Sequence, residues 1–140
     1  MRSAVVEQIV RARLILSGQV STGLLVALRY RAADPLAVQL VFPREYSLDE
    51  PTGPGEVVWT FARQLLAEGL ETPAGLGDVH IRPGRGPHTM VELRAAEGVA
   101  LLAFEAGELR RFLRAGYRLV PEGREHLHLD ADRALAELLG

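Results

Sequence analysis

Three successive runs near the N-terminus alternate apolar and polar residues, and this period of two constrains the fold more than any other feature. Successive side chains of a β-strand point to opposite faces, so such runs predict half-buried strands over 6–16, 24–30 and 36–42. Turn residues at 17–23 and 32–35 separate them, which favours an antiparallel meander. The residues predicted to face inward are Val6, Val10, Ala12, Leu14, Leu16, Leu24, Val26, Leu28, Tyr30, Leu36, Val38, Leu40 and Phe42.

The rest of the chain twice repeats an order of strands followed by a helix. A loop at 43–55 leads to a strand over 56–61, with Val57, Trp59 and Phe61 on one face, and then to a helix over 62–69. Strands follow at 77–84, 88–95 and 99–104, then a helix over 106–115, an extended piece at 126–129 and a helix over 130–139. Gly69 is expected to end the first helix in a left-handed conformation, and Gly116 to end the second. We therefore expect one α+β domain over 1–140, with two antiparallel β-sheets and packed helices.

Composition narrows the class of protein. The 140 residues are 48% hydrophobic and carry a net charge of −2, which indicates a globular chain without the basic surplus of most nucleic-acid binders. There is no cysteine, which excludes disulfides and thiolate chemistry. No apolar run approaches the roughly 20 residues of a membrane span, and the N-terminus lacks the apolar stretch of a signal peptide. A cytoplasmic protein without membrane insertion is expected.

One pattern alone suggests a metal site. His126 and His128 precede Asp130, and in a strand the two imidazoles would share a face. Further metal ligands are not evident in the sequence. The alternative explanation of the same residue pattern is a polar strand face that alternates with an apolar face formed by Leu127 and Leu129. No phosphate-binding loop, nucleophile motif or paired carboxylate is found, so we expect no enzyme, no metal and no cofactor.

Two surfaces are candidates for binding another molecule. Arg110, Arg114 and Arg118 lie four residues apart on the second helix, with Arg111 beside them, and would form a basic stripe. The alternative is an ordinary solvated face balanced by Glu105 and Glu108. The last helix presents Leu135, Leu138 and Leu139 either to the core or to another subunit.

A segment in the middle of the chain resembles a known family. It reads Trp59-x-Phe61-Ala62-Arg63-Gln64-Leu65-Leu66, then Gly69, Pro73, Gly75-x-Gly77-Asp78-Val79 and Pro83. Together with LRYRAADPLAVQLVF and the C-terminal EHLHLDADRALAELL, it is similar to the SsgA-like proteins of actinomycetes over nearly the whole chain. The chain departs from that pattern at Gln64, where the family tends to have aspartate, in a longer loop at 43–55 and in a shorter turn at 83–88.

The resemblance implies a function that the residues alone do not. Such proteins are non-enzymatic regulators of sporulation-specific cell division that help to position the septum and act on the tubulin-like protein FtsZ. The resemblance further implies a homotrimer that is located at division septa. Other division proteins or another SsgA-like protein would be its partners. The implied fold is similar to that of the whirly single-stranded DNA-binding proteins. Arg63 and Asp78, the polar members of the matching segment, would either pair across the turn or contact a partner.

A single-stranded nucleic-acid-binding module is the alternative function. The whirly analogy and the arginine stripe favour it, whereas the negative net charge and an aromatic content of only 6% weigh against it.

Overall fold

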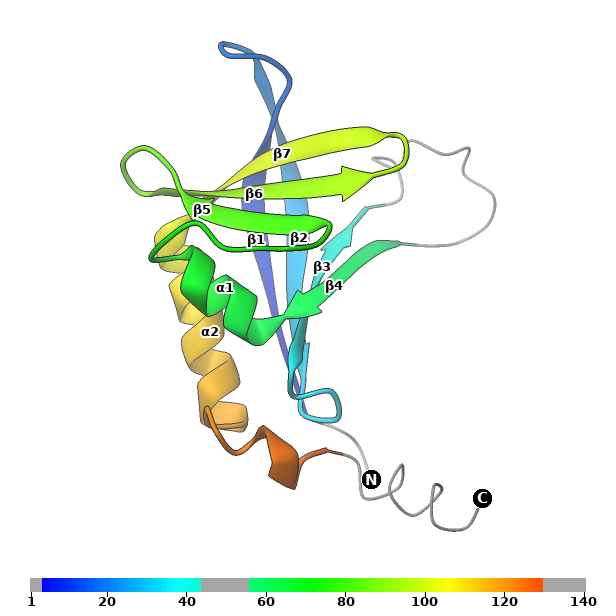
Figure 1. Cartoon of the computed structure of the whole chain (residues 1–140), viewed down its shortest axis with the longest axis vertical. Coiled ribbons are helices and arrows are strands. Elements are labelled where there is room, and N and C mark those ends of the chain that lie inside the picture. The colour runs from blue at the N-terminus through cyan, green and yellow to red at the C-terminus, as the bar shows by residue number, and fades with distance from the viewer. Residues whose placement is uncertain (1–3, 44–55, 130–140) are drawn as a thin grey trace.

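The computed structural model describes residues 4–43 and 56–129. Seven strands and two helices make up this part of the chain, as Figure 1 shows. In chain order they are β1 (Val5–Ile15), β2 (Ser21–Arg31), β3 (Ala37–Phe42), β4 (Val57–Ala62), α1 (Arg63–Gly69), β5 (Val79–Pro83), β6 (His88–Ala95), β7 (Gly98–Glu105) and α2 (Ala106–Leu119), followed by a 3-10 turn at Glu125–Leu127.

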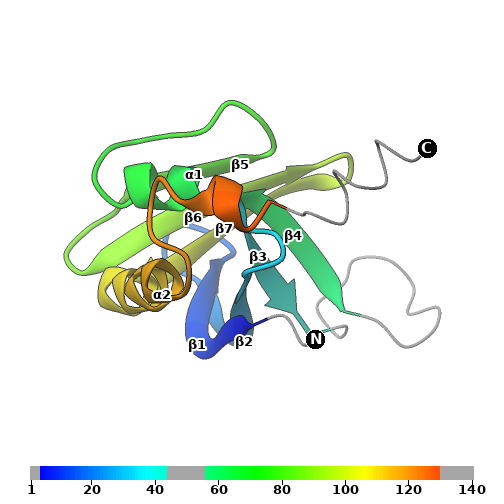
Figure 2. The ribbon, with the colours of Figure 1, turned by 90° about the horizontal axis from the view of Figure 1, so that it is seen from below.

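The strands form one sheet, in the order β4-β3-β2-β1-β7-β6-β5, with every neighbouring pair antiparallel. The expectation of two sheets is therefore wrong. The end of β1, Arg13–Ile15, pairs with Leu101–Ala103 of β7 and joins the two meanders. Figure 1 shows β5, β6 and β7 running across β1 and β2, so the single sheet is strongly curled. Figure 2 shows both helices on the same side of it.

The core lies between the concave face of the sheet and the two helices. The inward faces predicted for the first three strands are confirmed at most positions, with Tyr30 and Leu28 each 1% exposed. Leu16 and Leu36 are exceptions at 61% and 54% exposed, because both lie just outside the strands in turns. Trp59 packs half-buried against this core, and Phe61 is buried. The helices add Leu66, Leu109, Phe112 and Leu113.

Two glycines have roles other than the predicted helix caps. Gly69 does not have a positive φ; instead, a Cβ added there would lie 2.4 Å from the Cβ of Ile81. Its missing side chain lets α1 pack directly on β5. Gly116 does not end α2, which continues to Leu119, and a Cβ added at Gly116 would lie 3.5 Å from the Tyr30 ring. Close packing between elements, rather than chain reversal, thus explains both residues.

The chain after α2 also differs from expectation. Residues 126–129 are not extended, because the 3-10 turn occupies Glu125–Leu127 and a further turn follows it. The predicted helix over 130–139, and the loop at 43–55 beyond Pro43, lie outside the described residues. Within the described part, neither helix is long and apolar enough to cross a bilayer. The likeness to the whirly fold stays a prediction.

Candidate partner-binding surfaces

A buried arginine ties α1 to the end of α2. Arg63 is the first residue of α1, immediately after β4, and is 3% exposed. Its guanidinium lies between the rings of Tyr30 and Tyr117, 4.8 and 4.6 Å from their centroids. It donates hydrogen bonds to the carbonyls of Val120 (2.8 Å) and Gly116 (3.4 Å). We call this cluster the Arg63 clamp.

A carboxylate completes the clamp from the 3-10 turn. Glu125 Oε1 lies 2.7 Å from Arg63 Nη2 and also accepts a hydrogen bond from the backbone N–H of Gly123. Bonds from the backbone N–H of Glu125 itself and then from Arg63 hold the pKa of this carboxyl below its ordinary value of 4.5. Burial raises the pKa of both Tyr30 and Tyr117, so their rings stay neutral beside the guanidinium.

The clamp corrects two predictions about Arg63. It neither pairs with Asp78 nor lies on the surface, because α2, β2 and the 3-10 turn enclose it. Asp78 is exposed just before β5, where its backbone carbonyl accepts the N–H of Arg94. Arg63 therefore holds the fold together, and of the two residues only Asp78 is accessible to a partner.

The structure places the arginine stripe on the solvent face of α2. Arg110, Arg111, Arg114 and Arg118 are all exposed. Arg110 approaches Glu71 at 3.7 Å, whereas the other three form no ion pair with the described residues. The helix carries four arginines against one glutamate, Glu108, in a chain whose net charge is −2. Positive charge is thus concentrated on one exposed helix face.

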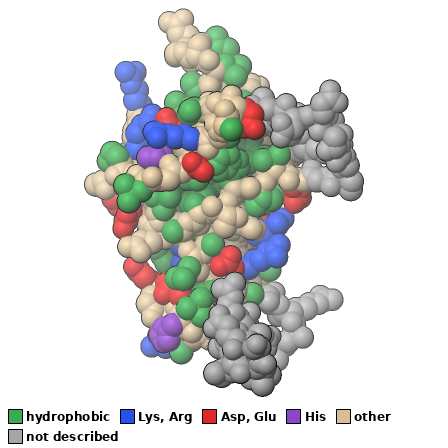
Figure 3. Space-filling model, turned by 45° about the vertical axis from the view of Figure 1, so that its right-hand side comes forward, with side chains coloured by type: hydrophobic (Ala, Val, Ile, Leu, Met, Phe, Trp, Pro, Cys, Tyr) green, Lys and Arg blue, Asp and Glu red, His purple; other side chains and the backbone are tan. Residues whose placement is uncertain are grey.

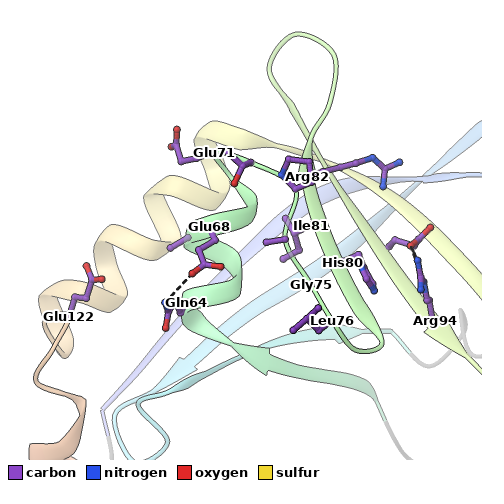
Figure 4. A pocket seen from close by; sticks show the side chains of 15 residues that line it. Gln64, Glu68, Glu71, Gly75, Leu76, His80, Ile81, Arg82, Arg94 and Glu122 are labelled. Atoms are coloured by element: carbon purple, nitrogen blue, oxygen red, sulfur yellow. Dashed lines mark hydrogen bonds and ion pairs between the residues drawn. The ribbon is translucent and has the colours of Figure 1, made fainter.

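A shallow hollow of about 990 Å³ lies between α1 and β5, a feature that the sequence analysis missed. Figure 4 shows its lining, which combines carboxylates from α1 and the following loop with basic side chains from the outward face of β5 and β6. Several of these groups bond to one another: Gln64 to Glu68 at 3.0 Å, and Arg94 to Glu92 at 2.8 Å. The labelled residues are Gln64, Glu68, Glu71, Gly75, Leu76, His80, Ile81, Arg82, Arg94 and Glu122. Of the charged groups in its lining, Arg94 is paired with Glu92, and Glu71 with Arg110 at 3.7 Å. The hollow is a shallow, open surface rather than an enclosed cavity.

Two other groups of residues were predicted to form sites, and the structure describes one of them. His126 and His128 lie on the 3-10 turn and its end rather than on one face of a strand. Within residues 4–43 and 56–129, no group of three His, Cys, Asp or Glu side chains is placed to hold a metal ion. Leu135, Leu138 and Leu139 lie outside the described residues.

Comparison with curated proteins gives relatives over most of the chain. SsgB, a sporulation-specific cell division protein of Streptomyces coelicolor, is 41% identical over 131 residues, which span 91% of this chain and 90% of the relative. The SsgB of Salinispora tropica is 39% identical over 142 residues, spanning 99% and 96%.

Solved structures agree with these relatives. One SsgB structure, described in connection with longitudinal cell division during sporulation of Streptomyces coelicolor, superposes with a TM-score of 0.80 at 38% identity, covering 91% of this chain and 97% of that one. An SsgA-like sporulation-specific cell division protein from Thermobifida fusca gives 0.79 at 32% identity, covering 97% and 96%. The family model of SsgA, the Streptomyces sporulation and cell division protein, matches residues 24–125. The chain therefore belongs to the SsgA family of sporulation and cell division proteins.

Proposed function

We propose that this protein is a non-enzymatic regulator of sporulation-specific cell division, which helps to position the septum and recruits FtsZ or promotes its assembly through protein–protein contacts. The observation that carries the proposal is the similarity to SsgB along nearly the whole chain, 39% over 142 residues. The proposal further places the protein at division septa as a homo-oligomer, a trimer by family resemblance.

The arginine stripe is the surface that we assign to an acidic partner. Arg111, Arg114 and Arg118 occupy positions i, i+3 and i+7 of α2, so they project from one face and span about 10 Å along the helix. Exposed charges without partners act over about a Debye length and speed the encounter with a surface of opposite sign. Contact through this stripe should therefore weaken as the salt concentration rises.

Co-sedimentation with FtsZ polymers tests the proposal. The purified protein should pellet with polymerised FtsZ, and Arg114→Glu combined with Arg118→Glu should reduce the bound fraction severalfold at low salt. Arg85→Glu is the matched control, because Arg85 is also exposed but lies in the β5–β6 turn rather than on α2. If the wild-type protein stays in the supernatant at every salt concentration, direct recruitment of FtsZ is refuted. If the paired variant and the control bind alike, the assignment of the stripe is wrong.

A salt-sensitive complex with single-stranded oligonucleotides is the competing outcome. The exposed arginines favour it, but nucleic-acid platforms also need exposed aromatic rings. Of the described aromatic side chains, Tyr30, Phe42, Phe61, Phe104 and Phe112 are buried, and Trp59 and Tyr117 pack against the core.

A further inference from the structure

β4 is an edge strand whose outer side has no partner among the described residues. It lies at one end of the seven-stranded sheet and pairs only with β3, from Ala37↔Ala62 to Phe42↔Val57. An edge strand presents a row of backbone donors and acceptors to whatever lies beside it.

The hydrogen-bonding pattern between β3 and β4 identifies the backbone groups of β4 that have no partner in β3. The N–H of Arg63 donates to the carbonyl of Leu36 at 2.8 Å, on the far side of the Ala37↔Ala62 pair. That bond makes Ala37↔Ala62 a non-hydrogen-bonded pair, and hydrogen-bonded and non-hydrogen-bonded pairs alternate along an antiparallel ladder. Phe61, Trp59 and Val57 therefore direct their backbone groups to β3. The N–H and C=O groups of Val58 and Thr60 point to the free edge.

The two edge strands of the sheet differ in how well they are protected against pairing with a further strand. At the other end, β5 is bridged by Ala74: its N–H donates to Ile81 at 2.8 Å, and Ile81 donates back at 2.9 Å. β4 has no such bridge among the described residues, and its sequence, VVWTFA, contains no charge, no proline and no glycine. Natural edge strands normally carry one of these devices against pairing. A bare edge of this composition is therefore suited to pairing with another strand.

We propose that β4 accepts an extended segment of a partner protein as an added strand of the sheet. The alternating backbone groups of Val58 and Thr60 are complementary to an extended backbone and not to a helix or a phosphate chain. The occupant is about six residues long, free of proline, and apolar at alternate positions, since β4 offers no charge for it to pair with.

The side chains beside the edge define two faces for that segment. Val58, 42% exposed, and Thr60 lie on the outer face of the sheet, whereas half-buried Val57 and Trp59 lie on the inner face. Figure 3 shows hydrophobic side chains gathered across the middle of the side of the molecule that includes β4. A strand added about 4.8 Å from β4 would extend this apolar surface and cover Trp59 further.

Trp59 makes the proposal directly testable, because it is the only tryptophan of the chain and lies on the edge strand itself. The probe is a synthetic peptide with the β3 sequence AVQLVF, flanked by arginines for solubility and titrated against the whole protein. We expect a saturable blue shift of Trp59 fluorescence. The same peptide with N-methylated backbone amides keeps every side chain but loses its donors, and should not bind. Absence of a shift up to millimolar peptide, or equal binding of the N-methylated peptide, would overturn the proposal.

Two variants of the protein locate the contact. Thr60→Pro removes one outward N–H without breaking the ladder to β3, and Val58→Lys places a charge on the edge. Each should weaken peptide binding about tenfold or more. Leu25→Lys is the control, because Leu25 is 51% exposed on the same outer face but belongs to β2, inside the sheet. Equal loss in the control would assign binding to the sheet face and refute the edge. A third outcome is that the protein binds no peptide but self-associates, and that Val58→Lys abolishes the self-association. That result would refute a partner protein and show that the β4 edge pairs with a second copy of the chain.

Discussion

Replacing Arg63 by alanine tests the Arg63 clamp most severely. The change removes the side chain of a residue that is 3% exposed, whose guanidinium bonds to two backbone carbonyls and one carboxylate and stacks between two tyrosine rings. Hydrogen bonds to charged groups contribute about 1.5–3 kcal/mol each, and removing one partner of a buried ion pair costs about 3–5 kcal/mol. Because the Glu125 side chain keeps 17% exposure and the Gly116 bond is long at 3.4 Å, we expect a loss of about 3–4 kcal/mol.

Urea unfolding at fixed protein concentration, followed by the fluorescence of Trp59, measures this loss. Arg63→Lys keeps the charge but loses the planar fork and the stacking, so it should cost about half as much as the alanine change. Arg85→Ala, at an exposed position, should change stability by less than about 0.5 kcal/mol. A loss below about 1 kcal/mol for Arg63→Ala would refute the clamp, and a lysine variant as stable as wild type would show that the fork geometry is irrelevant.

Three further predictions concern packing and pH. Gly69→Ala should destabilise by about 1–3 kcal/mol in urea unfolding despite alanine's better helix propensity, because its Cβ would overlap Ile81; Gly77→Ala, with no atom within 4 Å of the added Cβ, should be neutral. Phe112→Ala should cost about 3–5 kcal/mol in the same assay, since the ring is 1% exposed, and a loss under 1 kcal/mol would place it outside the core. The pKa of Glu125 is lower folded than unfolded, so its contribution is complete above pH 4.5 and is lost as pH falls through the folded-state value. The stability difference between wild type and Glu125→Gln should therefore shrink below that pH, and a constant difference from pH 6 to 3 would contradict this.

The sequence predicted individual strands well because their signal is local. Alternation at Leu24, Val26, Leu28 and Tyr30 follows from a strand with one buried face, and the structure confirms all four as buried. The number of sheets was not predictable in this way. It depends on the pairing of β1 with β7, about 90 residues apart, and the alternation in either strand is the same with or without that partner.

The glycines show a second limit of sequence reasoning. A glycine at a helix end has two physical explanations, a positive φ or a close approach, and the letters around Gly69 and Gly116 do not distinguish them. Only the short distances from these glycines to Ile81 and Tyr30 show that close approach of neighbouring elements is the correct explanation.

The candidate surfaces were predicted in part. The spacing of Arg110, Arg114 and Arg118 correctly indicated one exposed helix face, because three-to-four-residue periodicity is a local property. The burial of Arg63 was missed, although its place next to the apolar strand 57–61 is a signal of enclosure. Its partners, Tyr30 and Glu125, lie too far away in sequence for any pattern to connect them.

The proposed role in choosing division sites is tested most directly by imaging a fluorescent fusion of this protein in sporulating hyphae of its host, beside a DNA stain. The account predicts regular ladders of fluorescence between the nucleoids, present before the septa close and coincident with FtsZ. Fluorescence spread over the nucleoids would contradict it, and would make binding to nucleic acid through the arginine stripe the better explanation.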